Sequence, residues 1–336
     1  MIRGQGFGHA KVILIGEHGV VHGHPALAAG LAVGVRVEAV TGSGRLSVPG
    51  WSLTAKAGDG SPVGRALAAI LTRLRADDLD FRAEAAIPSR AGLGSSAAMA
   101  VAIARAAVAA SAQRLEPGRA GDQDGLPRPD DDLPRLRRAV DDAEAVFHGT
   151  PSGIDAAAAL GGGVGRFQRG LGWRPIAVAQ AMRICIGLTG RPRDTSAQVA
   201  AVTRLRERVP TVGKMLALFG DLADAGERAL AIGDVDGLGR LFDVAHGLLC
   251  ALRVSSPEIE ALVHGARAAG AIGAKLTGAG GGGAVIALAP AHEPDVIARW
   301  RRDGFDGFVT TIGNPDSIPA MGGGHDAEHA RDRGSP

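Results

Sequence analysis

Apolar residues recur with the period of a β-strand in several parts of the chain. The run at residues 11–16 (KVILIG) is apolar after its lysine and predicts a buried strand, whereas the alternation in residues 33–40 (VGVRVEAV) predicts a strand with one buried face. A Pro-Gly pair predicts the turn of a hairpin over residues 45–55. Further strands are predicted at residues 80–88, 183–190, 284–290 and 308–313.

Segments with helical spacing separate these strands. Leu136, Val140, Ala143 and Phe147 would share one face of a helix that stops at Gly149. Strands that alternate with helices in this order predict an α+β fold. The helices are predicted at residues 61–76, 95–110, 135–149, 194–207, 211–231, 235–251, 256–269 and 294–302.

Composition narrows the classes of protein to which the chain can belong. A chain of 336 residues, 46% of them hydrophobic, is long enough for a sizeable core and for two domains. The net charge of +2 and an aromatic content of 3% without Tyr argue against nucleic acid as a partner. Residues 1–11 carry no hydrophobic signal core, and no uncharged apolar run reaches about 18 residues. We therefore expect a cytoplasmic protein with no membrane contact.

The two cysteines and two polar segments are expected to carry no chemistry. Cys185 and Cys250 both lie between apolar residues without metal-ligand spacing, and we interpret them as buried free thiols in a reducing compartment. An insertion at residues 116–134 is rich in Pro, Gly and Asp and is predicted to be solvated. The tail at residues 315–336 is predicted to be disordered.

The stretch RAGLGSSAAMA at residues 90–100 joins a glycine loop to a plain, Ala-rich helix. Gly92 and Gly94 permit backbone angles and close approaches that a Cβ would prevent, and a helix that starts after such a loop favours an anion, most often phosphate. A tight turn that only packs against a neighbour explains this loop alone equally well. The hydroxyl groups of Ser95 and Ser96 could cap the helix or bind Mg²⁺.

Isolated charged residues outside this loop are further candidates for a functional site. Lys11, Glu17 and His18 bracket the first predicted strand and the turn after it, where they could also be ordinary edge and loop residues. Glu144 interrupts an apolar helical face, either at its rim or facing a cation. Asp155 precedes an alanine run, and helix N-capping would also explain it.

Glycines are concentrated at two later points. Arg166 follows a glycine cluster and could face an anion or solvent. Gly278, Gly280 and Gly283 match G-x-G-x-x-G, but a predicted strand follows them, which excludes a dinucleotide-binding βαβ unit. The sequence contains no Walker A loop either.

Glycine loops, a hydroxyl pair, isolated acids and a lysine together suit phosphoryl transfer. This reaction needs phosphate contacts, Mg²⁺ ligands, a cation and a group that orients the attacking hydroxyl.

These stretches resemble the three signatures of the GHMP kinases. The segments KVILIGEHGVVHGHPAL (11–27), PSRAGLGSSAA (88–98) and KLTGAGGGGA (275–284) occur in the family's order, and the resemblance covers residues 9–288. Within the family, residues 11–27 are similar to the mevalonate kinase branch, because Gly19-Val20-Val21 stands where a galactokinase would carry an Asp-Tyr pair. The segment HGTPSGIDAAAALGGGVGRF (148–167) also resembles that branch, with Thr150 where Asn is common.

The resemblance implies a GHMP kinase fold, with a ribosomal-S5-like α/β domain over residues 1–181 and a ferredoxin-like domain over residues 182–314. It implies ATP and Mg²⁺ as cofactors, mevalonate as the acceptor and phosphorylation of its 5-hydroxyl. The loop and the third signature would contact the ATP phosphates through Arg90, Ala91, Gly92, Leu93, Gly94, Ser95, Ser96, Ala97, Gly278 and Gly280.

The resemblance also implies roles for the isolated side chains. Ser96 and Glu144 would hold Mg²⁺. Asp155 would accept the proton of the substrate hydroxyl beside Lys11, although a loose transition state could make positioning matter more than proton removal. The mevalonate carboxylate and hydroxyl groups would meet Glu17, His18 and Arg166.

Two other functions stay open at this point. Another GHMP kinase could act on phosphomevalonate, homoserine or a sugar; phosphomevalonate would demand further basic residues, and the first signature supplies only Lys11 before Arg36. A non-catalytic relative that binds a nucleotide or metabolite would be expected to lack Lys11, Glu144 or Asp155, which are all present. A homodimer is the assembly that we consider, although the sequence does not fix the oligomeric state.

Overall fold

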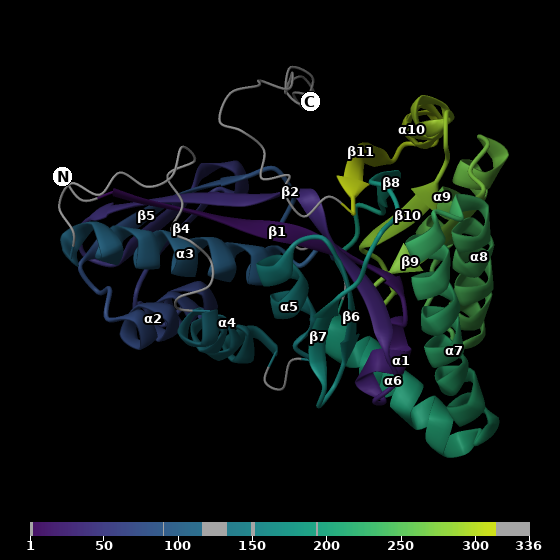
Figure 1. Ribbon diagram of the computed structural model, residues 1–336, viewed down its shortest axis with the longest axis horizontal. Coiled ribbons are helices and arrows are strands. Elements are labelled where there is room, and N and C mark those ends of the chain that lie inside the picture. The colour runs from purple at the N-terminus through teal and green to yellow at the C-terminus, as the bar shows by residue number, and fades with distance from the viewer. Residues whose placement is uncertain (1–2, 90, 116–132, 149–151, 193, 314–336) are drawn as a thin grey trace, which may run out of the picture.

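The computed structural model describes residues 3–89, 91–115, 133–148, 152–192 and 194–313. Within these ranges the chain forms two sheets with helices packed on them (Figure 1). The α+β prediction is therefore confirmed. Arg90, Thr150, most of the predicted insertion and the predicted tail lie outside the described residues.

The larger sheet is built around the long strand β2 (Ala26–Thr41). The strand order is β4-β3-β5-β2-β6-β7, and β1 pairs antiparallel along the length of β2. On β2, residues 35–41 pair with β5 and residues 26–29 pair with β6. The other strands of this sheet are β1 (Arg3–Ile15), β3 (Arg45–Val48), β4 (Leu53–Lys56), β5 (Leu79–Ala85), β6 (Val164–Gln168) and β7 (Gly172–Pro175). The predicted hairpin is confirmed, with the short 3₁₀ helix η1 (Pro49–Trp51) between β3 and β4.

The first strand begins at Arg3, eight residues before the predicted start, because glycines rather than apolar side chains line one of its faces. A Cβ on Gly6 would lie 2.1 Å from the carbonyl oxygen of Ala102, and a Cβ on Gly8 would lie 1.9 Å from that of Ala98. The backbone of β1 therefore rests directly on helix α3 (Ser95–Leu115). The alternation of Gly4, Gly6 and Gly8 was the sequence signal for this contact.

Helix α3 lies along one face of β1 and β2, and other helices flank it (Figure 1). By length and composition, residues 95–113 could cross a membrane, but 67% of that segment is buried inside the protein, as expected of a core helix. Its alanines pack with apolar residues of the sheet and of α2 and α4 in one core. The flanking helices are α2 (Pro62–Leu74), α4 (Leu133–His148) and α5 (Ile154–Gly161).

The smaller sheet has the strand order β11-β8-β10-β9, and all its pairs are antiparallel. With helices between the first and second strands and between the third and fourth, this is the ferredoxin-like arrangement that the family resemblance implied. Its strands are β8 (Met182–Leu188), β9 (Gly273–Thr277), β10 (Ala284–Leu288) and β11 (Asp306–Ile312). Its helices are α6 (Thr195–Arg208), α7 (Thr211–Ile232), α8 (Val235–Ala251), α9 (Pro257–Ala268) and α10 (Glu293–Arg302). The glycines of the third signature connect two antiparallel strands, so the exclusion of a βαβ dinucleotide unit is confirmed.

The two sheets share one hydrophobic cluster. Leu14 and Leu27 of the larger sheet pack in it with Ile186 of β8 and Phe242 of α8. The short helix α1 (Glu17–Val21), which directly follows β1, packs against α7. The end of β1 therefore lies where both halves of the molecule meet.

Candidate active site

The glycine loop 91–94 lies directly on β1. The N–H of Lys11 donates to the carbonyl oxygen of Leu93 at 2.9 Å. Gly94 has a φ of +71°, and a Cβ there would lie 2.8 Å from Cγ of Lys11. Gly94 therefore meets both demands that favour glycine, a left-handed backbone and a close neighbour. The loop delivers the chain into the first turn of α3, whose N–H groups favour an anion.

Lys11 and Asp155 form an ion pair at the start of α5. The Lys11 Nζ lies 2.9 Å from the Asp155 Oδ1, and the two side chains are 2% and 27% exposed. A ligand can therefore reach the carboxylate, while the ammonium group lies behind it. The N-cap of α5 is Gly153, with a φ of +87°, and Asp155 is the second residue of the helix. The alternative that Asp155 caps this helix is therefore wrong.

Glu144 and Ser96 complete a group of four polar side chains. Glu144 lies on α4 and is only 2% exposed, and its carboxylate lies close enough to the Ser96 side chain for Ser96 to influence its pKa. Burial, and after it the Asp155 carboxylate, raise the pKa of Glu144 to about 7, while Ser96 and Lys11 act in the opposite direction. The structure thus joins residues from β1, α3, α4 and α5 in one site.

This raised pKa predicts a pH-dependent stability difference for Glu144→Gln. In the folded protein Glu144 holds its proton up to about pH 7, whereas the ordinary value is 4.5. Between these values the folded state binds more protons than the unfolded state, so this residue's contribution to stability is present at low pH and is lost as pH rises through 7. With EDTA present, Glu144→Gln should unfold with a free energy about 2–3 kcal/mol above the wild type at pH 8 and equal to it near pH 4.5.

Urea denaturation at the two pH values measures this difference. Glu207→Gln, on the exposed side of α6, is the matched control and should match the wild type at both pH values. If the free energy of unfolding of Glu144→Gln exceeds that of the wild type by the same amount at pH 4.5 and pH 8, the raised pKa is contradicted.

Glu17 occupies a different place from the four-residue group. Its carboxylate forms an ion pair with the ammonium group of Lys275 on β9, and both side chains are 0% exposed. The Lys275 Nζ also donates to the carbonyl oxygen of Leu276 at 2.7 Å. Beside this pair, the Thr277 hydroxyl accepts from the N–H of Ile13 at 2.8 Å. An ion pair and a hydrogen bond therefore join the first and third signatures in the core between the sheets.

His18 and the glycines after β9 also meet. The Nε2 of His18 lies 2.9 Å from the carbonyl oxygen of Ala279, which stands between Gly278 and Gly280. A Cβ on Gly280 would lie 2.1 Å from the carbonyl oxygen of Val254, so this loop closely contacts the segment that follows α8. Support of the phosphate loop by Gly278 and Gly280 stays a prediction.

Arg166 on β6 is held by carboxylates of α7. Its Nη1 lies 2.6 Å from the Asp224 Oδ1 and 3.3 Å from the Glu227 Oε2, and Glu227 also pairs with Arg174 at 2.8 Å. Arg166 therefore faces carboxylates of the protein itself, and a bound anion at this residue stays a prediction. An anionic ligand at Arg166 would have to compete with them.

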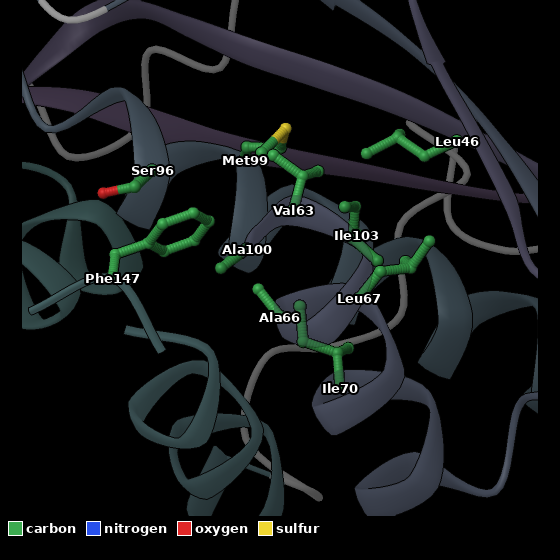
Figure 2. A pocket seen from close by; sticks show the side chains of 10 residues that line it. All are labelled: Leu46, Val63, Ala66, Leu67, Ile70, Ser96, Met99, Ala100, Ile103 and Phe147. Carbon is green, nitrogen blue, oxygen red and sulfur yellow. The ribbon is translucent and has the colours of Figure 1, made fainter. Parts of the chain in front are cut away.

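An apolar pocket adjoins Ser96 between α2, α3 and α4. Figure 2 shows the Ser96 hydroxyl and the Phe147 ring at one end and aliphatic side chains along the rest. The lining residues are Leu46, Val63, Ala66, Leu67, Ile70, Ser96, Met99, Ala100, Ile103 and Phe147.

Two residues that organise the site were missed in the sequence. Lys275 is the only charged residue in its glycine-rich signature, and its buried partner Glu17 is 258 residues away. Arg105 is the one charge in the buried part of α3, and it donates to the carbonyl oxygens of Phe7 at 2.6 Å and Leu160 at 2.7 Å. It thereby ties α3 to β1 and α5, which carry Lys11 and Asp155. A lone charge in an apolar segment was the available signal in both cases.

Sequence comparison places both halves of the chain in one family. Residues 61–163 match the family model described as "GHMP kinases N terminal domain", and residues 227–306 match the one described as "GHMP kinases C terminal".

Individual relatives cover most of the chain. A mevalonate kinase of Thermococcus gammatolerans is 32% identical over 90% of this chain and 94% of the relative. One of Aeropyrum pernix is 36% identical over 83% of this chain and 86% of the relative. Among solved structures, L. major mevalonate kinase in complex with R-mevalonate matches with a TM-score of 0.75 and 27% identity, over 92% of this chain and 95% of that one.

Proposed function

The chain belongs to the GHMP kinase family, and we propose that it transfers the γ-phosphoryl group of ATP to the 5-hydroxyl of mevalonate. The observation that carries this proposal is the group of Lys11, Asp155, Glu144 and Ser96, drawn from four separate elements into one site. The relatives named mevalonate kinase, at 32% and 36% identity, favour this acceptor over the others of the family. The predicted products are 5-phosphomevalonate and ADP.

We assign the ATP phosphates to loop 91–94 and the first turn of α3. Gly92 and Gly94 are left-handed and carry no Cβ, and the helix N-terminus offers N–H donors to the phosphate oxygens. The apolar pocket beside Ser96 has a volume of only about 10 Å³, so we do not place the nucleoside end of ATP inside it. This pocket and the proposed phosphate site share the first turns of α3.

The oxygen donors of Ser96 and Glu144 fit Mg²⁺. The Ser96 hydroxyl and the buried Glu144 carboxylate, which lies near Asp155, are hard oxygen ligands of the kind this ion prefers. Mg²⁺, when bound with ATP, would neutralise charge on the phosphates. Its positive charge would also favour the ionised form of Glu144, which burial and Asp155 disfavour.

Asp155 and Lys11 are assigned to the reacting hydroxyl. The Asp155 carboxylate is close enough to solvent to accept a hydrogen bond from the acceptor hydroxyl, which aligns that oxygen for attack and can take its proton. The buried Lys11 ammonium holds the Asp155 carboxylate through their ion pair and stabilises negative charge on the transferring group. Because the ion pair already exists in the protein, these groups need no rearrangement to act.

Glu17, His18 and Arg166 are our candidates for contacts to the acceptor. The mevalonate carboxylate would compete with Asp224 and Glu227 for Arg166. The buried pair with Lys275 favours a positioning role for Glu17 rather than direct contact. A cytoplasmic location is proposed with this function.

Initial rates of ADP release from Mg·ATP, with a panel of acceptors, test this function. R-mevalonate should give a kcat/KM at least 100-fold above those of phosphomevalonate, homoserine and galactose. Faster turnover with another acceptor would retain the phosphoryl-transfer site but overturn the proposed substrate. A folded protein that binds ATP and phosphorylates none of the four would contradict the proposal.

A further inference from the structure

A second cluster of polar side chains lies in the ferredoxin-like half, between α8 and α9. His246 and Cys250 stand four residues apart on α8, and Glu260 faces them from α9. His246 is 3% exposed, whereas Cys250 and Glu260 are partly open to solvent. The expectation that both cysteines are buried is therefore confirmed for Cys185, whereas Cys250 is only partly buried.

The three donor atoms form a compact triangle. The Cys250 Sγ lies 3.5 Å from the His246 Nε2 and 3.3 Å from the Glu260 Oε1, and the His246 Nε2 lies 3.2 Å from the same Oε1. A tetrahedral zinc ion with bonds of about 2.0–2.3 Å separates such nitrogen, oxygen and sulfur ligand atoms by roughly 3.3–3.6 Å. The triangle thus needs to expand by only a few tenths of an ångström to become one face of such a tetrahedron.

We propose that His246, Cys250 and Glu260 bind Zn²⁺, with a water molecule in the fourth position. The combination of one thiolate, one imidazole and one carboxylate selects zinc over Mg²⁺ or Ca²⁺, which prefer oxygen ligands. The ion would join α8 to α9 through side chains that have no part in the proposed phosphoryl transfer, so this proposal does not rest on the proposed function.

The surroundings of the triangle are compatible with a bound cation. The nearby cations are already paired, Arg267 with Asp243 at 2.7 Å and Lys275 with Glu17. The other Glu260 oxygen, Oε2, lies 3.6 Å from the His264 Nε2, and such a partner orients a ligating carboxylate.

Zinc binding would require two proton movements. The Cys250 thiol would lose its proton to solvent, and the ring proton of His246 would occupy Nδ1 instead of Nε2. Nδ1 now accepts from the N–H of Leu276 at 3.5 Å, so the moved proton would face this N–H and the His246 ring would have to turn away from it.

Titration of the tag-free, full-length protein with Co²⁺ and then Zn²⁺, after removal of metal by EDTA, tests the proposal. Co²⁺ should produce a thiolate-to-metal charge-transfer band in the near ultraviolet, and one equivalent of Zn²⁺ should abolish it. Cys250→Ser should remove the band, and His246→Gln should weaken Zn²⁺ affinity at least 10–100-fold. Cys185→Ala, which removes the other cysteine, is the matched control and should keep both band and affinity.

Metal bound elsewhere would give a different result. Binding at His325 and His329 of the tail would produce no thiolate band, and it would persist in Cys250→Ser. If the wild type shows no band, or if Cys250→Ser binds Zn²⁺ as tightly as the wild type, then the three side chains form only a hydrogen-bonded cluster and the proposal is wrong.

Discussion

Asp155→Asn is expected to lower kcat by about 10²–10⁴-fold while ATP still binds. The asparagine keeps the shape of the side chain but cannot accept the proton of the acceptor hydroxyl. It also removes the negative charge 2.9 Å from the buried Lys11 ammonium. Steady-state assays with Mg·ATP and mevalonate measure the loss, and calorimetric titration with ATP checks that the nucleotide site survives.

The matched control for this variant is Asp141→Asn. Asp141 also pairs with a basic residue, Arg137, at 3.0 Å on α4, but its side chain is 45% exposed. Its kcat should stay within twofold of the wild type. Lys11→Met should lose activity as Asp155→Asn does, and the double variant should be little worse than either, because the two groups act as a unit. A folded Asp155→Asn that keeps kcat within tenfold of the wild type would remove Asp155 from the mechanism.

Lys275→Met is expected to destabilise the protein by about 3–5 kcal/mol. The change leaves the Glu17 carboxylate without its cation at a position that is 0% exposed. Burial lowers the pKa of Lys275, and Glu17 opposes that shift, so the two charges depend on each other. Urea denaturation followed by circular dichroism should therefore give a markedly lower midpoint for this variant.

Replacing both partners separates the ion pair from simple loss of packing. Glu17→Gln/Lys275→Met removes both charges of this pair, so it should recover most of the stability lost by Lys275→Met. Lys214→Met, at an exposed position of α7, should stay within about 0.5 kcal/mol of the wild type. If Lys275→Met is as stable as the Lys214→Met control, the buried pair does not hold the two signatures together.

Local sequence patterns were sufficient for most of the fold. The four helices α6 to α9 begin and end within about two residues of their predicted bounds, because each has apolar residues at helical spacing and a Gly, Pro or capping residue near its ends. The short strands β6, β7 and β9 were not predicted. They lie within or beside glycine-rich segments, where the hydrophobic period is too weak to reveal a strand.

The candidate site was predictable only in part. Glycines, hydroxyl groups and isolated acids pointed to Ser96, Glu144, Asp155 and Lys11, and the structure brings these four together. The pairing of Glu17 with Lys275 could not be deduced, since it depends on how two sheets pack across 258 residues of sequence. A local pattern carries no information about such a contact.

The phosphorus NMR spectrum of the wild-type protein with Mg·ATP and R-mevalonate is the most direct test of the proposed reaction. We predict one new phosphomonoester for each ADP formed, with its phosphorus coupled to the two protons of the primary C5 carbon. A phosphorus signal without this coupling, or release of inorganic phosphate alone, would contradict transfer to the 5-hydroxyl of mevalonate.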